Sequence, residues 1–278
     1  MTNRFDPNDV ILVGSDDGET PNGKYVSSTN PLYVQPIDFF VAAGLGLIPG
    51  WSSLFVQGAL FPEIGVSGVK QTLWGESSRY IWPNTVETLE VVSDSSDDTS
   101  TGIGARSITF NYLDVNLDPK SVTVNLNGTT PVQVATDYYR PSALGTSVVS
   151  AGSNATNVGN IKIRRITDQA TRSVINAEKG RSFDAIFTVP KGESWSPNNV
   201  FANIAKNYDI NLEYLLRLPT TGVWFVLNEF NAYQSSNAFK NFVYLFLPEG
   251  TDFEGTVVPN QSGVLFTWVL EVLSKEVS

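Results

Sequence analysis

The stretch SDSSDDTSTGIG, residues 93–104, is the part of the sequence that most resembles a binding site. Asp94, Asp97 and Asp98 supply the hard oxygen ligands that calcium prefers. The EF-hand calcium loop also needs a central glycine and a closing glutamate at fixed positions, and both are missing from those positions here. The favoured interpretation is a turn whose backbone amides are capped by Asp and Ser side chains. We expect no bound metal.

Gly102 and Gly104 raise a second possibility, a phosphate-binding loop. Such a loop needs glycines that lead into the N-terminus of a helix, with a lysine nearby. Here the glycines lead into ARSITFNYL, in which apolar and polar residues alternate as they do in a strand. We therefore expect no nucleotide or other cofactor, and the glycines serve the path of the backbone.

The residue types that the sequence lacks exclude several kinds of catalytic group. It has no Cys and no His, which excludes thiol nucleophiles, imidazole bases and a Ser-His-Asp triad. A pair of carboxylates could still hydrolyse glycosides, and Glu229, Asp252 and Glu254 are candidates. We assign these three to solvated strand faces and turns. The sequence thus predicts a protein without enzymatic activity and names no catalytic residue.

The charge of the chain bears on its partners. Lys and Arg total 18 against 28 Asp and Glu, so the net charge is −10, and such a chain repels phosphate backbones unless its cations cluster. The one tight basic group is Lys162, Arg164 and Arg165, and alternation favours a solvated strand face there. No apolar run approaches the roughly 20 residues of a membrane span, and the N-terminus shows no export signal. We expect no nucleic-acid or membrane partner and synthesis in the cytoplasm.

The elements that must position these side chains are mostly strands. Apolar residues recur with a period of two, which is typical of half-buried strands. The alternating segments are residues 108–112, 122–126, 161–165, 183–189, 223–230, 242–247 and 264–272. This spacing predicts an all-β fold, an antiparallel, jelly-roll-like β-sandwich with little helix. One helix competes, at residues 200–208, where apolar residues also fit helical spacing.

The N-terminal part has a different composition. Residues 1–35 carry too few apolar side chains to form a core and predict an extended arm. A short apolar segment, PIDFFVAAGLGLIPGW, follows. We expect the arm and this segment to fill residues 1–70, a β-sandwich body to fill 71–190, and a C-terminal β-rich part, which can belong to the same sandwich, to fill 191–278.

The apolar segment is the candidate contact surface of the chain. Its residues either complete the core of this chain or contact a neighbouring protein, and the sequence leaves both interpretations open. The residues in question are Phe39, Phe40, Val41, Leu45, Leu47, Ile48 and Trp51.

Several sequence blocks follow one another in an order that carries a resemblance. They are IPGWSS, then TLWGESSRYIWPNTVETLEVVSDSSDDTSTGIGARSITFNYLD, then VTVNLNGTTPVQVATDYYRPSALGTSVVSAGSNATNVGNIKI, then GRSFDAIFTVPKGES. This succession resembles a family of virion structural proteins from tailed phages of marine and other environments. The resemblance runs from about residue 36 to the end, and residues 80–165 and 182–193 match most specifically. No catalytic residue belongs to the pattern of that family.

The resemblance implies a non-enzymatic component of the virion. The expected role is a capsid decoration or cement protein that attaches to the shell of major capsid protein and stabilises it, as a homo-oligomer with a trimer favoured. The alternative is a tail or fibre adaptor, a receptor-binding module that recognises a host surface glycan. The number of copies per particle separates the two, because a decoration protein is present in many copies and a tail module in few.

Overall fold

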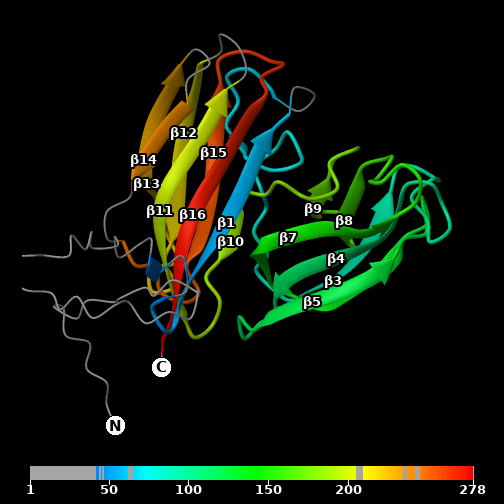
Figure 1. Ribbon diagram of the computed structural model, residues 1–278, viewed down its shortest axis with the longest axis horizontal. Coiled ribbons are helices and arrows are strands. Elements are labelled where there is room, and N and C mark those ends of the chain that lie inside the picture. The colour runs from blue at the N-terminus through cyan, green and yellow to red at the C-terminus, as the bar shows by residue number, and fades with distance from the viewer. Residues whose placement is uncertain are drawn as a thin grey trace, which may run out of the picture.

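The computed structural model of the chain describes residues 42–43, 45, 47–61, 65–204, 209–233, 237–241 and 245–277. The secondary-structure elements within these residues are sixteen strands. All strand pairs are antiparallel, and the strands form two β-sandwiches that lie side by side (Figure 1). The prediction of an all-β, antiparallel fold is confirmed.

The first sandwich contains both the earliest and the latest strands of the chain. One of its sheets has the strand order β1-β16-β11-β14, and the other has the order β10-β15-β12-β13 with β2 also paired to β15. Its strands are β1 (Trp51–Leu60), β2 (Gln71–Thr72), β10 (Ile186–Thr188), β11 (Glu193–Ile204), β12 (Asp209–Arg217), β13 (Trp224–Tyr233), β14 (Asn237–Asn241), β15 (Asp252–Pro259) and β16 (Phe266–Glu276).

The strands of this sandwich pair from the outside of the sequence inward. The first strand β1 pairs with the last strand β16, β2 and β10 pair with β15, β11 pairs with β14, and β12 pairs with β13. Because β2 and β10 follow one another along the same partner strand, they act as two halves of one strand. Eight strands nested in this way across two sheets have the jelly-roll topology. We call this part the jelly roll.

The second sandwich is inserted between the two halves of that interrupted strand. Its sheets have the orders β6-β3-β8-β9 and β5-β4-β7. Its strands are β3 (Glu87–Ser93), β4 (Ala105–Leu113), β5 (Pro119–Asn125), β6 (Val132–Tyr138), β7 (Arg140–Ala151), β8 (Ile161–Arg165) and β9 (Thr171–Ile175). We call it the inserted sandwich.

Each sandwich has its own hydrophobic core. In the jelly roll, the rings of Phe187 and Phe253 stack at 4.7 Å, and the indole N–H of Trp268 donates to the hydroxyl of Tyr214 at 2.8 Å. In the inserted sandwich, Ile108 of β4 and its neighbours face a separate cluster, as the period of two predicts. Two cores of this kind allow each sandwich to bury apolar surface of its own.

The strands group differently from the predicted division at residues 70 and 190. Strand β1 lies within the predicted arm, yet it pairs along its whole length with β16. The boundary at 190 falls between β10 and β11, which both belong to the jelly roll. Residues 191–276 therefore do not share a sandwich with residues 87–175.

The helix considered at residues 200–208 is wrong as far as residue 204, because residues 200–204 belong to β11. Val200, Ala202 and Ile204 are buried and Phe201 is exposed, so the period is two. In the sequence alone, the apolar residues Val200 and Phe201 are compatible with both the helical period of 3.6 and the strand period of two. Residues 205–208 lie outside the described residues.

Candidate functional site

The acidic loop at residues 93–104 joins strands of the inserted sandwich. The fully buried carboxylate of Asp98 accepts four hydrogen bonds. Its Oδ1 accepts from the backbone N–H of Ala105 at 2.8 Å and of Val158 at 2.9 Å. Its Oδ2 accepts from the Ser93 hydroxyl at 2.7 Å and from the Gly159 N–H at 2.9 Å. The side chain thus ties the end of β3 to the start of β4 and to the chain that enters β8.

Two glycines are required around this tie because the backbone approaches the carboxylates closely. A Cβ atom on Gly104 would lie 2.1 Å from Asp98 Oδ1, and one on Gly159 would lie 2.1 Å from Asp94 Oδ1. Asp94 in turn accepts from the backbone and side-chain N–H groups of Asn160, both at 2.8 Å. The loop is therefore a packed connection between strands, and donors of the protein itself occupy the oxygens of Asp98 and Asp94.

The three carboxylates considered for glycoside hydrolysis have different surroundings. Glu229 is exposed, as predicted, and accepts from Asn211 at 2.6 Å. The prediction of solvated positions is wrong for Asp252 and Glu254, which are 3% and 0% exposed. Both lie on β15, which is paired on both sides and buried along most of its length, and each is paired with an arginine. The sequence pattern of β15 gives no sign that its acidic residues point inward.

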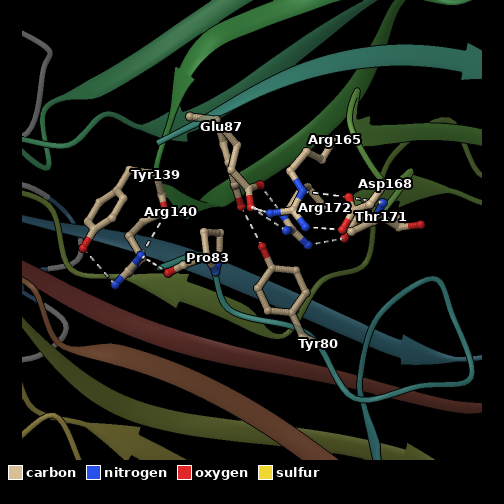
Figure 2. A network of polar contacts seen from close by, with 11 residues as sticks. Tyr80, Pro83, Glu87, Tyr139, Arg140, Arg165, Asp168, Thr171 and Arg172 are labelled. Atoms are coloured by element: carbon tan, nitrogen blue, oxygen red, sulfur yellow. Dashed lines mark hydrogen bonds and ion pairs between the residues drawn. The ribbon is translucent and has the colours of Figure 1, made fainter. Parts of the chain in front are cut away.

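A buried polar joint lies where the two sandwiches meet, and Figure 2 shows part of it. Glu87, at the start of β3, accepts from Nε of Arg172 at 2.6 Å and from its Nη2 at 2.7 Å. Both side chains are almost completely buried. Arg165 donates to the same carboxylate at 3.0 Å and also pairs with Asp168. These groups fix the start of the inserted sandwich against its strands β8 and β9.

Two tyrosines cross the joint. Tyr80 lies in the segment that leaves the jelly roll, and Tyr138 ends β6 of the inserted sandwich. Their hydroxyl groups are 2.6 Å apart and hydrogen-bonded. Burial raises the pKa of both phenols above its usual value, so both stay neutral at physiological pH. A neutral, hydrogen-bonded pair of this kind connects the two sandwiches without burying a charge.

The returning segment carries a buried acid to the same joint. Asp184 Oδ2 accepts from the hydroxyl of Ser173 at 2.9 Å, and Ser173 accepts from Thr146 at 2.8 Å. The other carboxylate oxygen of Asp184, Oδ1, is buried and has no hydrogen-bond donor among the described residues. Burial raises the pKa of Asp184 to about 6. The protonation of this carboxyl group therefore changes between mildly acidic and neutral pH.

The predicted contact residues fall partly outside the described residues, which is the case for Phe39, Phe40 and Val41. Leu45 and Leu47 are 66% and 42% exposed, and Ile48 and Trp51 are half-buried. That they contact a neighbouring protein stays a prediction.

The structure adds Phe246 to this group, because its exposed ring lies 6.1 Å from that of Trp51. Phe246 was not among the predicted contact residues, since some 200 residues of sequence separate it from the apolar segment. We call the exposed group of Leu45, Leu47, Trp51 and Phe246 the attachment end.

Carboxylates surround the attachment end. Glu193 stands directly opposite Glu276 in the pairing of β11 with β16, and Glu249 accepts from the backbone N–H of Gly192 at 2.8 Å. The ammonium group of Lys275 lies 5.6 Å from the centre of the Trp51 ring. Glu193, Glu249 and Glu276 therefore give this end an acidic rim.

Comparisons with known proteins name no family for the chain. No family model matches it, and no curated protein matches it. A solved structure of the Gt strain of infectious bursal disease virus is 10% identical over 87% of this chain and 83% of that chain, with a TM-score of 0.15. A VP2 subviral particle of infectious bursal disease virus is 8% identical over 82% and 75%, with a TM-score of 0.14. At TM-scores this low, the two structures indicate neither the fold nor the function of this chain.

The described part of the chain contains no helix long and apolar enough to cross a membrane. It also contains no group of three or more acidic side chains arranged to hold a metal ion.

Proposed function

We propose that the chain is a non-enzymatic structural protein of a virion, a capsid decoration or cement protein that attaches to the shell of major capsid protein. The observation that carries this proposal is the nested jelly-roll pairing that runs from β1 to β16. Viral capsid proteins are one of the main classes that use this topology. Lectins and cupins use it too, and the resemblance of the sequence blocks to tailed-phage virion proteins supports the viral use.

The proposed mechanism of attachment is burial of the arm and the attachment end. Leu45, Leu47 and Phe246 expose apolar side chains. Figure 1 shows the inserted sandwich to the side of the jelly roll, away from the end where the C-terminus lies. An arm that orders on docking loses roughly 1 to 2 kcal/mol of backbone entropy per residue. Apolar contact at this end, at roughly 25 cal/mol per Å² buried, offsets that loss.

The pairing of the buried carboxylates supports the non-enzymatic part of the proposal. A glycosidase needs one carboxyl group as acid and another as base or nucleophile, both facing a substrate. Asp252 and Glu254 instead accept hydrogen bonds from arginine and threonine side chains inside the fold. Asp252 and Glu254 therefore act as members of structural ion pairs.

The proposal includes a homo-oligomer, with a trimer favoured. Most soluble homo-oligomers have closed cyclic or dihedral symmetry, and a trimer is one such form. The acidic rim argues against an oligomer that joins attachment end to attachment end, since Glu193, Glu249 and Glu276 of two copies would then face one another. The subunit contact is better placed elsewhere on the chain. The mass of the purified protein in solution, measured by light scattering, tests this part.

The experiment that tests the function is a count and a map of the chain in purified particles of the virus that encodes it. We expect many copies per particle by quantitative mass spectrometry, and density for two sandwiches on the head shell by electron microscopy. A few copies at the tail would replace the proposal with the tail or fibre adaptor that recognises host glycan. Absence from the particle would overturn both.

A further inference from the structure

A pocket of about 440 Å³ lies between the two sandwiches. The inserted sandwich contributes Leu117, Tyr139 and Arg140 to its wall, and the jelly roll contributes Arg217, Pro219 and Asp252. Small-molecule sites have volumes of roughly 300 to 1,000 Å³ and occur preferentially where domains meet. The pocket therefore has the size and the position of a ligand site, and its charged side chains decide what it can hold.

Asp252 holds two arginines at this pocket, one from each sandwich. Arg217 stands directly opposite Asp252 in the pairing of β12 with β15, and its Nε donates to Oδ2 at 2.7 Å. Nε of Arg140 lies 3.3 Å from Oδ1 of the same carboxylate. Two guanidinium groups and one carboxylate leave a local charge of +1 in a chain whose net charge is −10.

The guanidinium group of Arg140 is fully engaged by the protein. Its Nη1 donates to the carbonyl oxygens of Pro83 and Tyr139 at 2.7 and 3.0 Å, and its Nη2 donates to the Tyr139 hydroxyl at 3.2 Å. Figure 2 shows this group turned toward Pro83 and Tyr139. Arg140 is thus a fixed positive charge in the wall, with the hydroxyl of Tyr139 beside it.

The guanidinium group of Arg217 is held in place by Asp252 and by two indole rings. Its buried Nη2 forms an ion pair with Asp252 Oδ2 at 2.5 Å. Within the described chain, no hydrogen bond from Nη1 to the protein is found. The rings of Trp224 and Trp82 lie 4.8 and 5.3 Å from its central carbon and fix its plane. Nη1 is therefore the donor that Arg217 offers to a ligand in the pocket that it lines.

We propose that this pocket binds a small ligand with a single carboxylate group, of the size of an acidic sugar. The carboxylate accepts hydrogen bonds from Arg217, because a planar guanidinium matches the geometry of a planar carboxylate. A monoanion neutralises the charge of +1, whereas a phosphate dianion would reverse it. The body of the ligand lies against Leu117 and Pro219, within reach of the Tyr139 hydroxyl. This inference does not depend on the proposed role in the virion.

The test is a calorimetric titration of the full chain with D-glucuronate and, separately, with D-glucose. We expect saturable binding of glucuronate with a dissociation constant in the millimolar range or below and no binding of glucose. A third titration uses the methyl glycoside of glucuronate, which imitates the end of a glycan chain. Binding of the glycoside identifies a glycan end as the source of the carboxylate, and its loss with glucuronate still bound identifies a free sugar acid. Equal heats for glucuronate and glucose, or no saturation with either, would overturn the proposal.

Variants separate recognition from folding. Arg217→Lys keeps the charge but removes the planar fork, so we expect glucuronate affinity to fall about tenfold or more. Tyr139→Phe keeps the ring and removes only the hydroxyl, and we expect a smaller loss, about threefold, in a fold that is unchanged by circular dichroism. Arg164→Lys is the matched control, since it makes the same change at a partly exposed arginine that pairs with Glu90 and does not line the pocket. Unchanged affinity in both Arg217→Lys and Tyr139→Phe would contradict the assignment.

Discussion

Arg172 and Glu87 form a two-point ion pair, at 2.6 and 2.7 Å, with both side chains almost completely buried. Removing one partner of such a pair leaves an uncompensated buried charge, which costs about 3 to 5 kcal/mol of stability. We therefore expect Arg172→Met to lower the free energy of unfolding by that amount in urea denaturation.

The double change Arg172→Met with Glu87→Leu is the control for this prediction. It removes both charges together, so we expect it to cost less than the sum of the two single changes. Additive losses would mean that the two residues stabilise the fold independently and would contradict the account of the joint.

The pH dependence of stability depends on Asp184. Burial raises its pKa to about 6, from an ordinary value of 3.8. The folded state therefore keeps the proton through a pH window in which the unfolded state has lost it. The free energy of unfolding should fall as the pH rises from about 4 to 6, by up to about 3 kcal/mol, and should then level off.

Asp184→Asn removes this titration. We expect the variant to be more stable than the natural chain at pH 7 and to lose this advantage toward pH 4, as measured by urea denaturation across the pH range. Asp97→Asn, a change of the same type at an exposed position, is the control and should leave the profile as it is. Identical profiles for the natural chain and Asp184→Asn would show that another group titrates.

The tie made by Asp98 predicts indifference to chelators. Because donors of the protein fill both carboxylate oxygens, EDTA should leave the melting temperature unchanged. Asp98→Ala should lower the free energy of unfolding by several kcal/mol, since it leaves the buried backbone N–H groups of Ala105 and Gly159 without acceptors. A melting temperature that falls in EDTA and recovers with calcium would instead identify a metal loop.

The arm should be separable from the folded body. A chain without residues 1–35 should stay soluble and unfold cooperatively, because all the strands in the described part of the chain begin at residue 51 or later. We expect this shortened chain to bind particles stripped of the protein far more weakly than the full chain does. Full-strength binding would show that the arm is not needed for attachment.

Phe246→Ser tests the attachment end within the full chain. We expect weaker binding to stripped particles without loss of fold, because the ring is 50% exposed. Val149→Ser, at a position 54% exposed on the inserted sandwich, is the matched control and should bind normally. Equal binding by the two variants would argue against the attachment end.

The sequence predicts those strands of the fold whose two faces differ. On β4, Ile108 and Phe110 are buried at the expected spacing, so the period of two is visible. Strand β15 is buried on both faces, so its sequence does not alternate between apolar and polar residues, and nothing in it shows that Asp252 and Glu254 form ion pairs inside the fold. At residues 93–104 the Asp and Ser residues indicate capping of backbone amides, and Asp98 makes such hydrogen bonds.

The pairing of distant segments was beyond prediction from one sequence. Strand β2 is only Gln71 and Thr72, too short for any period, and its place beside β10 depends on a partner more than 180 residues later. The same holds for the pocket, since Arg140 and Arg217 approach Asp252 only after both sandwiches have folded. Long-range pairing decides these features, and local patterns do not record it.

The pairing of β1 with β16 also sets the order of events during synthesis. The inserted sandwich is complete once residue 175 has left the ribosome, and it can fold while the rest of the chain is still being made. Strand β1 can pair with β16 only after more than 200 further residues have been synthesised, and contacts between segments so distant in sequence form slowly. The backbone hydrogen bond from the N–H of Glu276 to the carbonyl oxygen of Gly50, beside the attachment end, is among the last to form. A prematurely terminated chain therefore cannot complete that end of the jelly roll, and under the proposed function such a chain would not attach to the shell.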